Sequence, residues 1–168
     1  MDEPVIDAEV KAAATRVLDL CRARGLTVAT AESCTGGLVA GALTEIPGSS
    51  DVVCCGFVTY SNDAKRDLVG VPVAMLTAHG AVSRETAEAM ACGSLEKSGA
   101  HLAVAITGIA GPGGGSAAKP VGLVHFAAAS ADGALIAREK RFGDIGRSEV
   151  RRLSVLEALA LLEQLAGR

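Results

Sequence analysis

The sequence has very few aromatic residues: no tryptophan, one tyrosine and three phenylalanines among 168 residues. Proteins that bind single-stranded nucleic acids commonly stack the bases on aromatic rings. The chain also lacks an excess of positive charge, because 16 Lys and Arg stand against 19 Asp and Glu and give a net charge of −3. Binding to the phosphate backbone depends on such an excess, so we do not expect a nucleic acid to bind directly.

Long hydrophobic runs and paired metal ligands are also missing. No stretch of about 18 residues is free of polar interruptions, and the first residues are acidic where a secretory signal would be basic. We therefore expect a cytoplasmic protein that does not associate with membranes. The five cysteines include no CxxC pair, and the three histidines are widely spaced. These patterns favour neither a disulfide framework nor a metal site.

What the chain does contain is enough apolar residues for a folded core. Hydrophobic residues make up 49% of the sequence and charged residues 21%, a balance that argues against disorder. The length is typical of one domain, so we expect a single domain over residues 1–168.

Helical and strand patterns alternate along most of the chain. The apolar spacing and the Gly, Pro, Ser and Asn punctuation predict helices over residues 6–24, 35–46, 62–70, 83–99 and 147–165. Buried strands are predicted over residues 26–31, 52–60, 101–107, 121–130 and 134–142. The segment 71–82 reads as a proline-containing link, and Asp132-Gly133 predicts a hairpin. This order predicts a three-layer α/β/α sandwich with a mixed, mostly parallel sheet.

Three polar, glycine-containing segments lie where a predicted strand ends or a helix begins, which is where α/β sheets collect ligands. The first runs from Ala31 to Gly37 and offers hydroxyls, flexible backbone and a helix N-terminus suited to phosphate. A capped strand-to-helix turn explains the same pattern equally well.

The second segment pairs Gly48-Ser49-Ser50 with the run from Tyr60 to Lys65. A serine hydroxyl needs a base to become a nucleophile, and a desolvated lysine can serve as that base. Tyr60, the single tyrosine, can relay a proton. Composition alone favours a solvated helix lysine for Lys65 and an ordinary turn for Ser49-Ser50.

The third segment is the glycine-rich loop from Thr107 to Ser116, which can present backbone amides to an anion or can be a flexible surface loop. Near the end of the chain, Arg147 is placed to reach an anionic ligand. Arg151 and Arg152 read as a solvated helix face.

The combination of these segments resembles a known family. The motifs that carry the resemblance occur in this order: Ala31-Glu32-Ser33-Cys34-Thr35-Gly36-Gly37, Gly48-Ser49-Ser50, Gly56-Phe57-Val58-Thr59-Tyr60-Ser61-Asn62, Ala64-Lys65, His79-Gly80-Ala81-Val82-Ser83, Thr107-Gly108-Ile109-Ala110-Gly111-Pro112-Gly113-Gly114 and Lys119-Pro120-Val121-Gly122. Over about residues 5–165 they resemble the CinA C-terminal domain family, the nicotinamide-nucleotide amidases. The resemblance implies hydrolysis of nicotinamide mononucleotide to nicotinate mononucleotide and ammonia in pyridine-nucleotide recycling, without a metal or organic cofactor.

The resemblance also implies roles for particular residues. We expect Ser50 to attack the amide, Lys65 to act as its base and Tyr60 to assist proton transfer, with Ser33 as the rival nucleophile. The expected substrate contacts are Thr35, Gly36, Gly37, Thr107, Gly108, Gly111 and, as a phosphate or ribose contact, Arg147.

Two further expectations concern partners. Relatives in this family tend to self-associate, so we expect a homodimer or a higher homo-oligomer. The family name refers to competence and DNA damage, which leaves an alternative open: a protein-binding module without catalytic activity.

Overall fold

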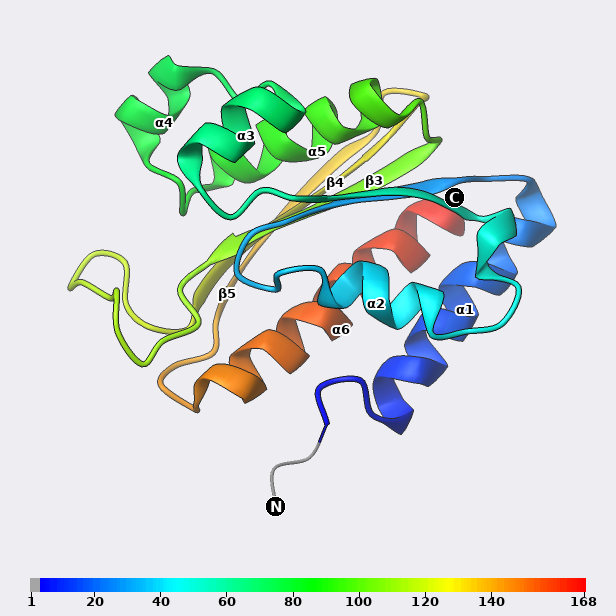
Figure 1. Cartoon of the computed structure of the whole chain (residues 1–168), viewed down its shortest axis with the longest axis horizontal. Helices are drawn as coiled ribbons and strands as arrows, with labels where there is room; N and C mark the ends of the chain where they lie inside the picture. The colour runs from blue at the N-terminus through cyan, green and yellow to red at the C-terminus, as the bar shows by residue number, and fades with distance from the viewer. Residues whose placement is uncertain (1–3) are drawn as a thin grey trace.

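A five-stranded sheet in the order β2-β1-β3-β4-β5 forms the centre of the computed structural model, which describes residues 4–168 (Figure 1). The strands are β1 (Val28–Glu32), β2 (Val53–Val58), β3 (Leu102–Gly108), β4 (Leu123–Ser130) and β5 (Leu135–Arg141). β1, β2 and β3 run parallel, β4 is antiparallel to β3, and β5 is antiparallel to β4. Four strands therefore share one direction, which confirms the predicted mixed, mostly parallel sheet.

Helices cover both faces of this sheet. They are α1 (Ala8–Arg24), α2 (Leu38–Thr44), α3 (Asn62–Val69), α4 (Val73–His79), α5 (Arg84–Ser98) and α6 (Arg147–Ala166). Figure 1 shows α3, α4 and α5 on one face and α1, α2 and α6 on the other. The predicted three-layer α/β/α sandwich is confirmed.

Alanines form much of the layer between the sheet and α5. They come from β1, β3 and β4 on the sheet side and are Ala87 and Ala91 on the helix side, where Met90 is the one large buried residue. Small residues let a helix approach the sheet closely and still reach interior packing density. The opposite face packs larger residues, including Phe126, against α1 and α6. Aliphatic side chains thus make up almost all of the core.

Side-chain caps place several helix boundaries where the sequence predicts them. Ser61 Oγ accepts a hydrogen bond of 3.0 Å from the Ala64 amide at the start of α3, and Ser83 Oγ accepts one of 3.2 Å from Thr86 at the start of α5. Gly70 and Gly99 end these helices with left-handed φ angles of 69° and 70°, the usual helix C-cap conformation. The predicted β4–β5 hairpin is confirmed as well.

Two predicted boundaries differ from the structure. The link 71–82 contains the helix α4, which begins after Pro72 and buries none of its residues; without a buried stripe it has no apolar periodicity to detect. The helix expected from residue 35 begins only at Leu38, because Gly36 and Gly37 take φ angles of 58° and 106°. These angles belong to a left-handed turn and not to a right-handed helix.

None of the helices within residues 4–168 combines the length and the apolar character required to cross a bilayer.

Candidate active site

Strand register brings three loops together at the C-terminal ends of the parallel strands. Glu32 at the end of β1 pairs with Val58 of β2 on one side and with Ile106 of β3 on the other. The chain therefore leaves all three parallel strands at the same level, where ligand sites form in such sheets. A cleft of about 290 Å³ opens there, lined by Ser33, Cys34, Tyr60, Lys65, Ala81, Val82, Thr107, Gly108, Ile109, Ala110, Gly111, Gly113, Gly114 and Arg147.

Lys65 lies at the buried end of this cleft. Its side chain projects from α3, and the residue is only 1% exposed. The Nζ atom lies 2.7 Å from the Thr59 carbonyl oxygen, 3.3 Å from the Tyr60 carbonyl oxygen and 3.0 Å from Ser33 Oγ. All three partners are uncharged, and within residues 4–168 this lysine forms no ion pair with a carboxylate.

Burial without a counter-charge lowers the pKa of Lys65 from 10.5 to about 8, because a low-dielectric surrounding disfavours the charged form. Near neutral pH a usable fraction of this amine is therefore unprotonated. A neutral amine has two N–H groups and one lone pair. If the two N–H groups donate to the Thr59 and Tyr60 carbonyls, the lone pair faces Ser33 Oγ.

The structure therefore pairs Lys65 with Ser33 and not with Ser50. Ser33 is 9% exposed and directly follows β1, whereas Ser50 is exposed on the short 3-10 turn Ser49–Asp51 that precedes β2. The six residues of β2 separate that turn from the cleft by roughly 20 Å. The expectation that Lys65 takes the proton of Ser50 is therefore wrong, because Ser50 lies at the N-terminal end of β2 and Lys65 lies near its C-terminal end.

Tyr60 and Arg147 form the outer rim of the cleft. Tyr60 is 60% exposed, and its hydroxyl accepts a 3.2 Å hydrogen bond from Arg147 Nη2. Arg147 Nη1 donates a 2.9 Å bond to the carbonyl of Gly111 in the glycine loop. The arginine at the start of α6 thus joins two loops that are far apart in sequence. Lys65 contacts Tyr60 only through its main-chain carbonyl, so the phenol hydroxyl is left to bond Arg147.

The opposite wall is made by the end of β3 and the glycine loop. Thr107 is buried, and its hydroxyl donates a 2.8 Å bond to the Ala81 carbonyl. A Cβ atom on Gly108 would lie 2.8 Å from the Leu123 carbonyl oxygen, and one on Gly111 would lie 2.5 Å from Val121 Cγ1. These distances are too short for a side chain, so close packing against Leu123 and Val121 explains the two glycines. Thr107, Gly108 and Gly111 all line the cleft.

Three expected substrate contacts do not line the cleft. Thr35 is fully buried, and Gly36 and Gly37 form the turn that leads into α2. A Cβ on Gly36 would lie 3.4 Å from Arg151 Nη2. These residues therefore form the turn that connects Ser33 to α2 and do not contact the cleft.

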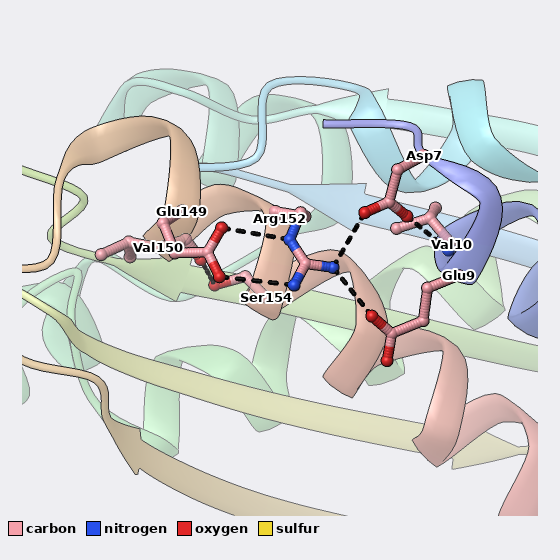
Figure 2. Close-up of polar contacts among 7 residues, drawn as sticks. All are labelled: Asp7, Glu9, Val10, Glu149, Val150, Arg152 and Ser154. Carbon is pink, nitrogen blue, oxygen red and sulfur yellow. Dashed lines mark hydrogen bonds and ion pairs between the residues drawn. The ribbon is translucent and has the colours of Figure 1, made fainter. Parts of the chain in front are cut away.

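Two arginines expected on a solvated face are engaged in contacts. Arg151 donates to the carbonyls of Cys34 and Thr35. Figure 2 shows Arg152 between the carboxylates of Asp7, Glu9 and Glu149, each at 3.1 Å, and these acids raise the pKa of Arg152 above its usual value. That interpretation of Arg151 and Arg152 is wrong, because residues 7–9 and the Ser33 loop fold back against α6.

Sequence reasoning also missed two residues near Ser33. The Glu32 carboxylate is buried and accepts hydrogen bonds from the amides of Val39 and Ala40 at 2.8 and 3.1 Å, which anchors the start of α2. Cys34 lines the cleft, but burial raises the pKa of its thiol to about 12. A thiol in that state is a poor nucleophile. Its position in the motif Ala31–Gly37 is the one sequence signal that separates Cys34 from the other cysteines.

Metal ligands do not gather at this site: nowhere in residues 4–168 do three His, Cys, Asp or Glu side chains come together as a metal-binding group.

The fold and the site define a class of protein: a single α/β sandwich domain with a buried lysine–serine pair at the C-terminal ends of its parallel strands. A sequence model of the CinA C-terminal domain matches residues 10–166. The chain belongs to the CinA C-terminal domain family.

Relatives and solved structures agree with this membership. The chain is 51% identical over 161 residues to a "CinA-like protein" of Synechococcus sp. (strain RCC307). This alignment covers 95% of the chain and 38% of that protein. It is 56% identical over 140 residues to one of Mycolicibacterium gilvum, which covers 83% of the chain and 33% of that protein. The chain thus spans about a third of the length of these curated relatives.

Among solved structures, the chain is similar to the competence/damage inducible protein CihA from Agrobacterium tumefaciens. The TM-score is 0.94, the identity is 54%, and both chains are covered completely. A CinA superfamily protein from Klebsiella pneumoniae superposes with a TM-score of 0.89 at 36% identity, covering 94% of this chain and 98% of that one.

Proposed function

We propose that this domain is an amidase that hydrolyses the carboxamide of nicotinamide mononucleotide, with Ser33 as the nucleophile and Lys65 as its base. The observation that carries the proposal is the 3.0 Å contact between Ser33 Oγ and a buried, uncompensated lysine amine at the inner end of a cleft. Proton transfer from a nucleophile requires a distance of about 2.6–3.2 Å and a base whose pKa lies near the working pH. Lys65 meets both requirements.

In the first half of the reaction, neutral Lys65 takes the Ser33 hydroxyl proton as Oγ forms a bond to the amide carbon. The resulting oxyanion is held by backbone N–H groups of the glycine loop, which lines the facing wall. The C–N bond then breaks, and the leaving nitrogen takes the proton from Lys65 and departs as ammonia. Water, deprotonated by the same amine, then hydrolyses the ester on Ser33 to release the carboxylate and restore the hydroxyl.

The rest of the substrate extends from the inner end of the cleft to its rim. Arg147 supplies the positive charge there, and its guanidinium geometry suits bidentate contact with a phosphate. The Tyr60 hydroxyl lies next to Arg147 at the cleft opening, where it can contact the ribose or assist proton transfer. The size of the cleft, about 290 Å³, is sufficient for the pyridine carboxamide.

Incubation of the purified protein with nicotinamide mononucleotide tests the proposal directly. We expect release of one ammonia per nicotinate mononucleotide formed, measured by a coupled ammonia assay and by chromatography of the nucleotides. A Lys65→Met variant is the control, because it removes the amine and retains most of the buried volume. Failure of the wild-type protein to release ammonia would reject nicotinamide mononucleotide as the substrate, and an unreactive Ser33 in addition would favour the alternative of a protein-binding module.

A further inference from the structure

Arg151 of α6 holds the loop on which Ser33 lies. Its Nε donates a 3.1 Å hydrogen bond to the Cys34 carbonyl, and its Nη2 donates a 3.3 Å bond to the Thr35 carbonyl. These two acceptors belong to the residues directly after Ser33. A planar guanidinium that donates to two neighbouring carbonyls restrains the loop in both position and orientation.

Backbone bonds hold the start of the loop more firmly than the residues after Ser33. The Ser33 amide donates to the Ile106 carbonyl of β3 at 2.9 Å, and the bonds within the loop are Gly36 N to Ser33 O and Leu38 N to Thr35 O, both at 3.0 Å. The loop also contains two consecutive glycines in left-handed conformation, and glycine allows many alternative backbone angles. Among residues 4–168, Arg151 is the only side chain that donates to the Cys34 or Thr35 carbonyls. The loop therefore depends on α6 for part of its geometry.

The helix that carries Arg151 is a stable platform. α6 is 20 residues long and buries one face against β3, β4 and α1. Arg147 lies four residues before Arg151, so the two side chains project from the same face one turn apart. Arg147 reaches the glycine-loop wall through Gly111, and Arg151 reaches the nucleophile wall through Cys34. One helix face thus supports both walls of the cleft.

We propose that Arg151 is a positioning residue that keeps Ser33 Oγ within proton-transfer distance of Lys65 Nζ. This inference rests on the proposed role of Ser33 as nucleophile. It predicts that loss of the two loop bonds slows the attack by Ser33 without removing the substrate contacts at Arg147. A displacement of about 1 Å in a reacting group typically costs on the order of 100-fold in rate.

The test compares Arg151→Met with the neighbouring Arg152→Met in the full chain. We expect Arg151→Met to lower kcat about 10- to 100-fold with KM within about threefold of the wild type. The pH at which activity is half-maximal should move little, because burial lowers the pKa of Lys65 and the variant retains that burial and the contacts with the Thr59 and Tyr60 carbonyls. Arg152→Met removes contacts to Asp7, Glu9 and Glu149 but none to the loop, so it should lower Tm and leave kcat unaltered.

A second readout does not depend on the substrate. A phosphonofluoridate reagent phosphonylates activated serines, and mass spectrometry gives both the site and the rate of modification. We expect Ser33 to be labelled 10- to 100-fold more slowly in Arg151→Met than in the wild type and at the wild-type rate in Arg152→Met. Arg151→Lys, which retains one donor, should label at an intermediate rate.

The outcomes separate this inference from the proposed function. If the wild type is labelled at Ser33 but releases no ammonia, the substrate assignment fails and the labelling rates still decide the role of Arg151. Labelling of Arg151→Met at the wild-type rate would overturn the inference, as would a wild type that is not labelled at Ser33. If Arg151→Met does not fold, Arg151→Lys takes its place, and unfolding of both variants would also overturn a positioning role.

Discussion

The loops at the two ends of the parallel strands contain similar residues in very different surroundings. We call the C-terminal ends the carboxyl edge and the N-terminal ends the amino edge. At the carboxyl edge, Ser33 follows β1 and meets the amine of a buried lysine. At the amino edge, Ser50 precedes β2 on an exposed turn, where Arg22 donates to the Gly48 carbonyl at 3.1 Å and lies 3.7 Å from Asp51. Both serines lie in glycine-containing turns, so residue type does not distinguish them. Their environments do, because only the carboxyl edge buries a titratable partner.

The charges at the two edges also behave differently. At the amino edge, the pair of Arg22 and Asp51 is exposed to water, and such pairs contribute little. At the carboxyl edge, Lys65 is removed from water and bonded only to neutral oxygens. Removal from water is costly for an ammonium group, and the same cost makes the amine available as a base. Four predictions test this difference, beginning with the largest expected effect.

The first prediction compares the two serines by substitution with alanine. Ser33→Ala should lower kcat by at least about 10³-fold, since loss of a nucleophile leaves only the rate enhancement from binding and oxyanion stabilisation. Ser50→Ala should stay within about twofold of the wild type because its side chain lies outside the cleft. Ammonia release measures both variants. Equal losses in the two variants would show that the contrast between the edges is mistaken.

The second prediction concerns Lys65. Lys65→Met should lower kcat about 10²- to 10⁴-fold through loss of the general base, while circular dichroism and Tm show a folded protein. Lys11→Met is the matched control, because Lys11 is half-exposed and paired with Glu45 at 2.9 Å. Turnover close to the wild-type rate in Lys65→Met would remove this lysine from the reaction.

The third prediction is the pH dependence of activity. With a pKa of about 8 for Lys65, kcat/KM should rise about tenfold per pH unit at low pH and level off above about pH 8, because only the neutral amine accepts the proton. Steady-state rates between pH 6 and pH 9.5 measure this profile. A flat profile, or one whose rising limb lies near pH 6, would point to another base.

The fourth and smallest effect is on stability. Below about pH 8, Lys65 is charged in both states and burial destabilises the native protein. Between about pH 8 and 10.5 the native state releases the proton and the unfolded state retains it, so stability rises with pH. Relative to Lys65→Met, the free energy of unfolding of the wild type should increase by about 2–3 kcal/mol from pH 7 to pH 10. Urea unfolding measures this difference, and a constant difference would contradict the lowered pKa.

Much of the fold was predictable because its signals are local. The Ser61 and Ser83 caps, the closing glycines and the Asp132-Gly133 turn each act over a few residues, and each was confirmed. The helix α4 was missed since it buries no residue and leaves no periodic pattern. The start of α2 was placed three residues early, because the left-handed angles of the two glycines depend on the turn as a whole.

Residue types indicate most of the side chains at the cleft but not how they pair. Tyr60, Lys65, Thr107, Ser33 and the loop glycines line the cleft, whereas Thr35, Gly36, Gly37 and Ser50 do not. Which serine contacts Lys65 depends on the parallel register of β1 and β2. Without that register, Ser33 and Ser50 are both possible. Arg151 had no signal that separated it from Arg152, apart from its spacing of four residues from Arg147.

The sequence by itself determined the order of helices and strands, the family and the set of candidate site residues, because these depend on residue types and short-range spacing. Only the tertiary structure decided which serine lies 3.0 Å from Lys65 Nζ, how far that amine is buried, and which arginine supports the loop. The physical reason is that proton transfer and desolvation depend on distances between segments separated by tens of residues along the chain. Those distances are set by strand register and by the packing of α6.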